Sequence, residues 1–343
     1  MTHHHHQELE TVAQAMVAKG KGILAADEST GTITKRLAGV NVESTEENRR
    51  AYRDLLFTSP GIDAHISGVI LYDETIRQAT SDGTPFPQLL KDRGIIPGIK
   101  VDMKAKPLAG FPGEKVTEGL TGLRERLGEY RELGGQFAKW RAVISIGEDI
   151  PSRVCIESNA HALARYAALC QEAGIVPIVE PEVLMDGDHD IDRCEQVTTA
   201  MLQQLFYDLV QHQVLLEGTV LKPNMVISGK ECAAQAGVEE VAERTVKTLM
   251  RVVPPAIPGI AFLSGGQSAK LATEHLNAMN AMGEHPWNLT FSYGRALQEP
   301  TLSFWKGDAS KVEGAQKLLQ HRAKCNGAAT KGQYSKEMEK VAA

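Results

Sequence analysis

The chain has 343 residues, of which 42% are hydrophobic and 23% charged, and its formal net charge is −6. These values are ordinary for a globular protein and exclude a disordered, collagen-like or disulfide-scaffold chain. The acidic balance and an aromatic content of only 5% disfavour binding to nucleic acid or to an anionic membrane. The sequence contains no run of 18 apolar residues, so no membrane-spanning helix is predicted.

Cysteine usage favours a reduced, cytoplasmic protein. The five cysteines are odd in number and form no C-x-x-C pair, and the N-terminus lacks the apolar segment of a signal peptide. We interpret His3–His6 as a tag remnant or a disordered native tail. Beyond that tract no His, Cys or carboxylate group has metal-ligand spacing, so the sequence predicts no metal site.

Short apolar runs with the character of buried strands alternate with longer amphipathic stretches. There are eight such runs, at 23–26, 66–72, 95–101, 137–146, 176–183, 214–221, 260–263 and 289–293. Helical patterns between them include 158–173, 197–212, 238–252 and 268–282, with Thr45, Ser158 and Ser268 as expected N-caps and Gly174 as an expected C-terminal cap.

This alternation predicts an α/β fold in which helices cover a parallel sheet. Eight units favour a closed (β/α)8 TIM barrel, and a doubly wound open sheet is the alternative. We expect residues 1–19 to form an N-terminal segment that includes the start of the first helix, and residues 20–322 to form a single barrel. The small, polar, Gly-containing residues 323–343 are predicted to be a mobile tail.

Charged side chains gather at the carboxyl ends of the predicted strands. A single charge there is usually a solvated loop residue, but six strand ends together point to a site, because barrel enzymes carry their catalytic residues on this rim. The balance of charges suits an anionic small molecule. The residues are Asp27, Lys100, Asp102, Lys139, Arg141, Glu180, Glu182, Lys222 and Arg295.

Lys222 is the best candidate nucleophile, although an exposed lysine before a loop is the plainer reading. It ends an apolar run, and Pro223 favours extended backbone at that point. Apolar walls and cationic neighbours such as Lys139 and Lys100 lower the pKa of an amine, which is what a Schiff-base lysine requires.

Glycine-containing segments follow the last two predicted strands. They are 264–268 (SGGQS), which opens a helix, and 292–295 (SYGR). Glycines let backbone N–H groups approach an anion, and barrel enzymes often bind phosphate after strands seven and eight. Two ordinary glycine turns are the alternative.

At these residues the chain closely resembles class I fructose-1,6-bisphosphate aldolase. The resemblance covers about residues 20–325 and implies a (β/α)8 barrel, a homotetramer, a sugar bisphosphate substrate and no metal or organic cofactor. The matching segments, in family order, are 22–31, 45–50, 98–102, 137–141, 174–182, 221–225, 262–268 and 291–296.

The resemblance also implies roles for individual residues. Lys222 matches the Schiff-base lysine, Glu180 the acid of imine formation, and Asp27 the carboxylate that takes the C4 hydroxyl proton. Lys139 and Glu182 match neighbours that tune charge. The C1 phosphate site is matched by Ser264, Gly265, Gly294 and Arg295, and the C6 phosphate site by Ser29, Thr32 and Lys100, with Arg36 and Arg141 nearby.

One departure concerns the C-terminus, where many family members carry a tyrosine that folds over the site. This chain ends in Val-Ala-Ala, and Tyr334 is the only aromatic residue of the tail. We predict reversible cleavage of fructose 1,6-bisphosphate in glycolysis and gluconeogenesis. The alternatives are a lysine aldolase that prefers fructose 1-phosphate or sedoheptulose bisphosphate, and a scaffold protein without chemistry.

Overall fold

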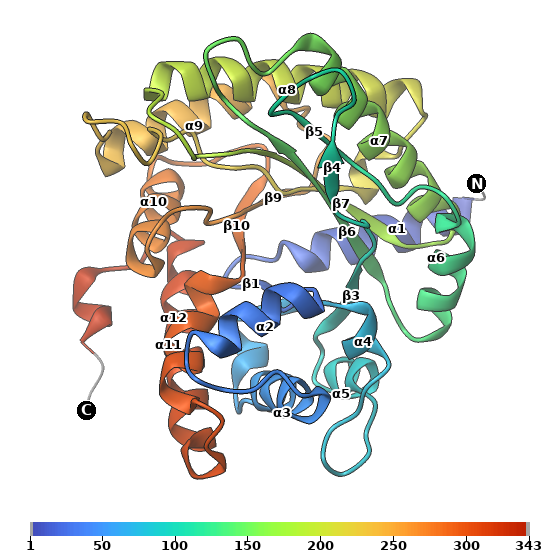
Figure 1. The fold of residues 1–343 in the computed structure, drawn as a ribbon, viewed down its shortest axis with the longest axis vertical. Helices are drawn as coiled ribbons and strands as arrows, with labels where there is room; N and C mark the ends of the chain where they lie inside the picture. The colour runs from blue at the N-terminus through green and yellow to red at the C-terminus, as the bar shows by residue number, and fades with distance from the viewer. Residues whose placement is uncertain (1–2, 341–343) are drawn as a thin grey trace.

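A closed barrel of eight parallel strands is the centre of the computed structural model, which describes residues 3–340. The strand order around the barrel is β1-β10-β9-β8-β7-β6-β3-β2, and helices surround it (Figure 1). The barrel strands are β1 (Gly22–Ala25), β2 (Ile66–Leu71), β3 (Ile96–Lys100), β6 (Phe137–Ile144), β7 (Val176–Val183), β8 (Val220–Leu221), β9 (Gly259–Phe262) and β10 (Asn288–Tyr293). This is the predicted (β/α)8 barrel, and the open-sheet alternative is wrong.

The helices and a small hairpin complete the described chain. The hairpin strands β4 (Ala105–Pro107) and β5 (Lys115–Thr117) pair antiparallel between β3 and α6. The helices are α1 (His3–Met16), α2 (Thr30–Ala38), α3 (Glu46–Phe57), α4 (Asp73–Ile76), α5 (Phe86–Asp92), α6 (Leu123–Glu132), α7 (Arg153–Glu172), α8 (Ile191–Gln211), α9 (Val238–Val252), α10 (Ala269–Ala281), α11 (Arg295–Trp305) and α12 (Val312–Ala329), with 3₁₀ turns η1 (Ile62–Ala64), η2 (Leu216–Gly218), η3 (Ala309–Lys311) and η4 (Lys336–Glu339).

The barrel closes where β1 pairs with β10. Ile23 lies opposite Ser292 in that ladder, and Thr290 Oγ1 donates to the backbone oxygen of Lys21, 269 residues away in the chain. The first and last barrel strands therefore bring Asp27 and Arg295, far apart in sequence, to the same rim.

Helix α1 fills the amino end of the barrel. Its buried face, with Val17 just beyond its end, packs into the interior cluster that also contains Ile23 and Phe137. Gly259 of β9 has no side chain because a Cβ there would collide with Val17. Because α1 closes the amino end of the barrel, a cavity can open only at the carboxyl end of the strands. No described helix combines the length and hydropathy needed to cross a bilayer.

Most expected elements are confirmed, but the sixth strand and the start of α7 differ from their predicted boundaries. The sixth predicted strand is shorter, because residues 216–218 form η2 and only Val220–Leu221 pair. Ser158 lies inside α7, whose N-cap is Ser152. Gly174 follows α7 with φ +70°, as expected of a C-terminal cap.

The C-terminal segment differs from the expected tail. Residues 323–329 continue α12, since Ala323, Cys325 and Ala329 are buried against neighbouring helices. Beyond it Tyr334 is 8% exposed, and its hydroxyl donates to Glu339 Oε1 over 2.9 Å. The predicted start of the tail, at residue 323, was therefore too early. The small residues after it were read as a sign of a mobile segment, but alanine and glycine also suit close packing between helices.

Candidate active site

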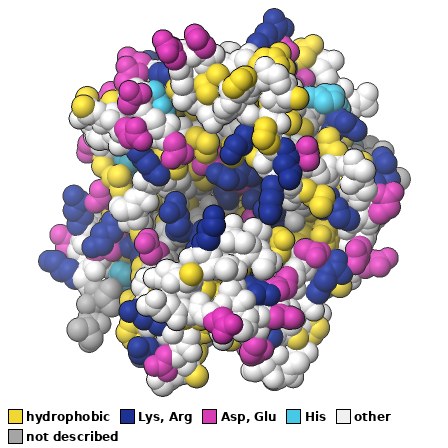
Figure 2. All heavy atoms as spheres, viewed as in Figure 1, with side chains coloured by type: hydrophobic (Ala, Val, Ile, Leu, Met, Phe, Trp, Pro, Cys, Tyr) yellow, Lys and Arg dark blue, Asp and Glu magenta, His cyan; other side chains and the backbone are white. Residues whose placement is uncertain are grey.

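A cavity of about 550 Å³ opens at the carboxyl ends of the barrel strands. Figure 2 shows lysine and arginine side chains gathered around this hollow. Eight basic and five acidic side chains line it, a formal excess of three positive charges in an acidic chain. Every residue singled out from the sequence lies on the wall: Asp27, Ser29, Thr32, Arg36, Lys100, Lys139, Arg141, Glu180, Glu182, Lys222, Ser264, Gly265, Gly294 and Arg295.

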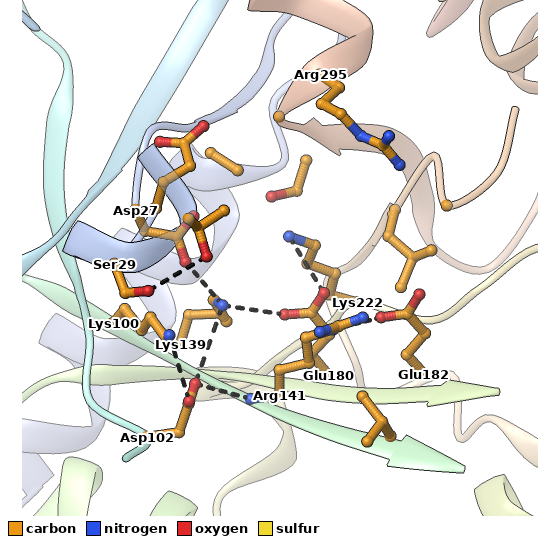
Figure 3. A pocket seen from close by; sticks show the side chains of 18 of the residues that line it. Asp27, Ser29, Lys100, Asp102, Lys139, Arg141, Glu180, Glu182, Lys222 and Arg295 are labelled. Carbon is orange, nitrogen blue, oxygen red and sulfur yellow. Dashed lines mark hydrogen bonds and ion pairs between the residues drawn. The ribbon is translucent and has the colours of Figure 1, made fainter. Parts of the chain in front are cut away.

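Lys222 lies directly after β8, deep in the cavity. Its backbone N–H donates to Val179 of the neighbouring β7, which fixes the start of the side chain. Only 5% of the side chain is exposed, and its Nζ lies 3.5 Å from Glu180 Oε1 (Figure 3). The amine is therefore sheltered from bulk water and has one carboxylate as a close neighbour.

Lys139 lies among three carboxylates. Its Nζ is 2.7 Å from Asp27 Oδ2, 3.5 Å from Glu180 Oε2 and 4.0 Å from Asp102 Oδ2 (Figure 3). These residues come from β6, β7 and the loops after β1 and β3. The barrel rim thus assembles one connected charge network, with Lys222 attached to it through Glu180.

Burial and mutual attraction oppose each other in this network. Burial disfavours the charged form of Asp27, but Lys139 and Lys222 outweigh it and hold the pKa of Asp27 below its usual range. The pKa of Glu180 is also lowered, because Lys222 and Lys139 overcome its burial. The pKa of Lys139 is raised, since Asp27 and Glu180 outweigh its desolvation. All three groups are charged at neutral pH.

Arg141 and Glu182 form a second pair on the neighbouring strands. They stand two residues beyond Lys139 and Glu180, so they share the inward face of β6 and β7. Arg141 Nε donates to Glu182 Oε2, and a Cβ on Gly265 would lie 3.0 Å from Glu182 Oε1. Glu182 therefore connects Arg141 to the glycine loop after β9.

The glycine loop leads into the N-terminus of α10. Gly266 has φ +74°, and a Cβ there would collide with Met185, so both backbone and space require glycine. Ser268 caps α10 by accepting from the N–H of Leu271 at 3.2 Å, as expected. Arg295 begins α11 across the cavity (Figure 3). Backbone donors, helix N-termini and a guanidinium thus face one region, which suits a phosphate.

The opposite wall carries hydroxyl groups and a lysine. Ser29 and Thr32 Oγ atoms are 3.2 Å apart at the start of α2, and Lys100 Nζ lies 3.6 Å from Asp102 Oδ1. Arg36, expected near this wall, pairs with Glu28 and lies beside Gly294, with its Nη2 3.9 Å from where a Cβ of Gly294 would be. Arg36 therefore stands at the β1–β10 seam, close to the Gly294–Arg295 wall.

Several lining residues were given no catalytic or phosphate-binding role from the sequence. Asp102 was recognised as a strand-end acid, and the structure connects it to Lys139 and Lys100. Glu28 is buried and accepts from Arg53 at 2.7 Å, which a sequence signal alone does not reveal. Lys35 could have been found from its place one helical turn after Thr32 in α2. Other residues on the wall include Lys104, Met185 and Ser292.

The chain is similar to known proteins over almost all of its length. Residues 8–343 match the family model of class I fructose-bisphosphate aldolase. The chain is 62% identical over 329 residues to a probable fructose-bisphosphate aldolase class 1 of Xanthomonas campestris, covering 96% of this chain and 98% of that one. It is 55% identical to a cytosolic fructose-bisphosphate aldolase of Arabidopsis thaliana, covering 95% and 91%.

A solved structure is also similar over nearly its full length. It is the fructose-bisphosphate aldolase of Plasmodium falciparum in complex with TRAP and a small-molecule inhibitor. The TM-score is 0.97 at 49% identity, and the match covers 98% of this chain and 97% of that one.

Proposed function

The chain belongs to the class I fructose-bisphosphate aldolase family, and from this premise we propose how its cavity works. The enzyme reversibly cleaves fructose 1,6-bisphosphate to dihydroxyacetone phosphate and glyceraldehyde 3-phosphate, as a carbon–carbon lyase of glycolysis and gluconeogenesis. The observation that carries the proposal is the buried Lys222 amine, 3.5 Å from Glu180, which is connected through Lys139 to Asp27.

The first chemical step joins the substrate to the enzyme. The ammonium group of Lys222 first passes a proton to the neighbouring Glu180 carboxylate, and the uncharged amine then attacks the C2 ketone. Glu180 returns this proton to the hydroxyl that leaves as water. The product is a protonated imine. Glu180 suits this role because it lies beside Lys222, and its second oxygen faces Lys139, which can restore its charge balance.

The second step breaks the C3–C4 bond. Asp27 takes the proton of the C4 hydroxyl, C4 becomes the aldehyde of glyceraldehyde 3-phosphate, and the bonding electron pair moves into the protonated imine. The resulting enamine is neutral, so no free carbanion forms. Asp27 is a competent base because Lys139 keeps it ionised within a largely buried site.

Binding energy comes from the two ends of the substrate. Ser264, Gly265, Gly294 and Arg295 bind the C1 phosphate, and Ser29, Thr32 and Lys100 bind the C6 phosphate. These contacts are remote from the reacting carbons and fix their orientation. Arg36, beside Gly294, adds charge at the C1 end, and Arg141, held by Glu182, faces the middle of the cavity.

Borohydride trapping tests the assignment. Reduction in the presence of dihydroxyacetone phosphate should leave one stable adduct on Lys222, located by peptide mass mapping. Lys222→Met should lose cleavage while keeping the circular dichroism of the fold. Lys230→Met is the matched control, because Lys230 is on a nearby loop outside the cavity wall and pairs with Asp186. An adduct on another lysine would overturn the mechanism.

Substrate choice and metal dependence have separate tests. Turnover should be higher on fructose 1,6-bisphosphate than on fructose 1-phosphate. Lys100→Gln should reduce the ratio of the two turnover rates about tenfold, because the loss of a charge-assisted hydrogen bond to the C6 phosphate costs about 1.4 kcal/mol. Cleavage should be unchanged in EDTA. Equal turnover of both sugars in the unmodified enzyme would point to a different substrate.

We also propose that the enzyme is a cytoplasmic homotetramer. The tetramer is what the family resemblance implies, and the cytoplasmic location is supported by the cytosolic Arabidopsis relative and by the free cysteines. Sedimentation equilibrium should give four times the chain mass of 37.3 kDa. A monomer at micromolar concentration would contradict the assembly.

A further inference from the structure

Three potential metal ligands meet between α12 and the C-terminal segment, far in the fold from the barrel cavity. His321 and Cys325 are four residues apart on α12, and Glu339 ends η4. Cys325 Sγ lies 3.7 Å from His321 Nε2, and His321 Nε2 lies 3.8 Å from Glu339 Oε2. The sequence spacing between the helix and Glu339 gives no hint of this cluster.

Two of the three separations between these atoms are close to those around a single tetrahedral ion, and the third, from Cys325 to Glu339, is within 4.8 Å. Zinc–sulfur bonds of about 2.3 Å and zinc–nitrogen bonds of about 2.0–2.1 Å at tetrahedral angles separate S from N by roughly 3.5 Å. The observed separations are a few tenths of an ångström longer. Side chains one helical turn apart on α12 share a face, so two of the ligands are already positioned by the backbone.

The ligand atoms are sheltered and still available. Cys325 is buried, and the side chains of His321 and Glu339 are 17% and 10% exposed. Glu339 Oε1 accepts from Tyr334 at 2.9 Å and from Arg322 at 2.6 Å, whereas Oε2, the atom that faces His321, accepts only from Arg322 among the described residues. A carboxylate oxygen has a second lone pair, so Oε2 can bind a metal without releasing Arg322.

The surrounding charges select the kind of ion. Arg322, Lys324 and Lys270 all act on Cys325, and Glu339 is the acid that faces it. These cations repel any divalent ion, and hard ions such as Mg²⁺ and Ca²⁺, which prefer oxygen ligands, gain little from sulfur and nitrogen to offset that repulsion. A borderline-soft ion gains from bonds to sulfur and to imidazole nitrogen, the atoms that Cys325 and His321 offer.

We propose that His321, Cys325 and Glu339 form a structural site for Zn²⁺ or a similar borderline-soft divalent ion, with water in the fourth position. The ion would join η4 to α12 and so hold the C-terminal segment on the barrel. Binding replaces the thiol proton of Cys325, which is released to solvent, so the affinity rises with pH. The site takes no part in the aldol reaction.

Cobalt substitution tests the site directly, because a thiolate bound to Co²⁺ gives a near-ultraviolet charge-transfer band that imidazole and carboxylate ligands do not. The His3–His6 tract also binds such ions, so the titration uses the full chain with these four residues changed to serine. One equivalent of Co²⁺ should produce the band, Zn²⁺ should abolish it, and Mg²⁺ and Ca²⁺ should leave it unchanged.

Three variants make the result specific. Cys325→Ser should remove the band. His321→Gln should weaken Co²⁺ binding roughly 100-fold, because even the loss of a residue that hydrogen-bonds to a metal ligand can weaken metal affinity by that factor. Cys232→Ser, which changes a partly exposed cysteine elsewhere, should keep the band. Zn²⁺ should also slow proteolysis of the segment after residue 329 in the parent chain but not in Cys325→Ser. A missing band, or a band that survives Cys325→Ser, would overturn the site.

Discussion

The ammonium group of Lys139 lies 2.7 Å from the carboxylate of Asp27, with 6% and 13% of the two side chains exposed. Each group therefore holds the other in its charged form inside a largely dehydrated cavity. The same ammonium contacts Glu180, so a single cation supports both carboxylates of the proposed mechanism.

Replacement of this cation should damage both stability and the acid limb of the pH profile. In Lys139→Met the strongest of the cations that oppose the burial of Asp27 is gone, so the pKa of Asp27 rises from its lowered value. During acidification Asp27 then becomes protonated at a higher pH than in the parent enzyme, so the acid limb of the kcat/KM profile should move to higher pH. At neutral pH, kcat/KM should fall about 100-fold. Steady-state kinetics across pH would check this.

We also expect Lys139 and Asp27 to be coupled energetically, which a double-mutant cycle measures. Leaving a buried carboxylate unpaired costs about 3 kcal/mol, measurable by urea unfolding. The double variant with Asp27→Asn should recover part of that loss, since it removes the stranded charge. Strictly additive losses would show that the two side chains do not stabilise each other.

Tyr334 should be dispensable for turnover. Its hydroxyl donates to Glu339, and the residue is not on the cavity wall, so it does not stand in for the terminal tyrosine of other family members. Tyr334→Phe should leave kcat within about twofold and lower the free energy of unfolding by about 1 kcal/mol through the lost hydrogen bond. A tenfold loss of kcat with an intact fold would show that the tail reaches the substrate.

The glycine loop after β9 should tolerate no side chain at its turn. Gly266→Ala forces a left-handed backbone conformation on alanine and a collision with Met185, a strain of about 1–3 kcal/mol. Dihydroxyacetone phosphate should bind at least fivefold more weakly, as measured by calorimetry. The matched control is Gly237→Ala before α9, where φ is −76° and nothing lies closer than 4.0 Å to the new Cβ. Equal binding by the two variants would contradict a phosphate role for the loop.

His275 should make the fold sensitive to mild acid. Burial lowers the pKa of His275 to about 4 from its usual 6.5, and its Nδ1 lies 2.6 Å from Gln267 Oε1. Because the unfolded chain binds this proton more readily, the stability from the neutral ring is complete above pH 6.5. The free energy of unfolding then declines between pH 6.5 and pH 4, and His275 contributes at most about 1.4 kcal/mol of this decline per pH unit. Urea unfolding of the parent and of His275→Asn checks the slope, which should be shallower in the variant.

The sequence was sufficient to predict the barrel because its strands are buried on both faces. Runs such as 66–72 and 176–183 are largely apolar segments, and helical segments lie between most of the strands. The sixth strand was predicted too long, because hydrophobicity in 214–219 also suits a buried 3₁₀ turn. Ser158 was a plausible cap, but Ser152 begins the helix one and a half turns earlier.

Most residues that line the cavity were identified from the sequence, but the contacts between them were not. A strand end identifies which side chain points inward, so Lys139, Glu180 and Lys222 were found, and the family resemblance added residues of the loops. Position alone does not reveal which groups touch. The proximity of Arg36 to Gly294 and the cluster around Glu339 both depend on contacts between segments distant in the chain, for which the sequence has no local signal.

The seam between β1 and β10 has a consequence for synthesis of the chain. Asp27 is synthesised long before Arg295, yet both line one cavity whose wall closes only when Ile23 pairs with Ser292. A nascent or prematurely terminated chain can carry the reactive lysine without the completed enclosure around it. The cavity is therefore complete only after β10 has been synthesised and has paired with β1.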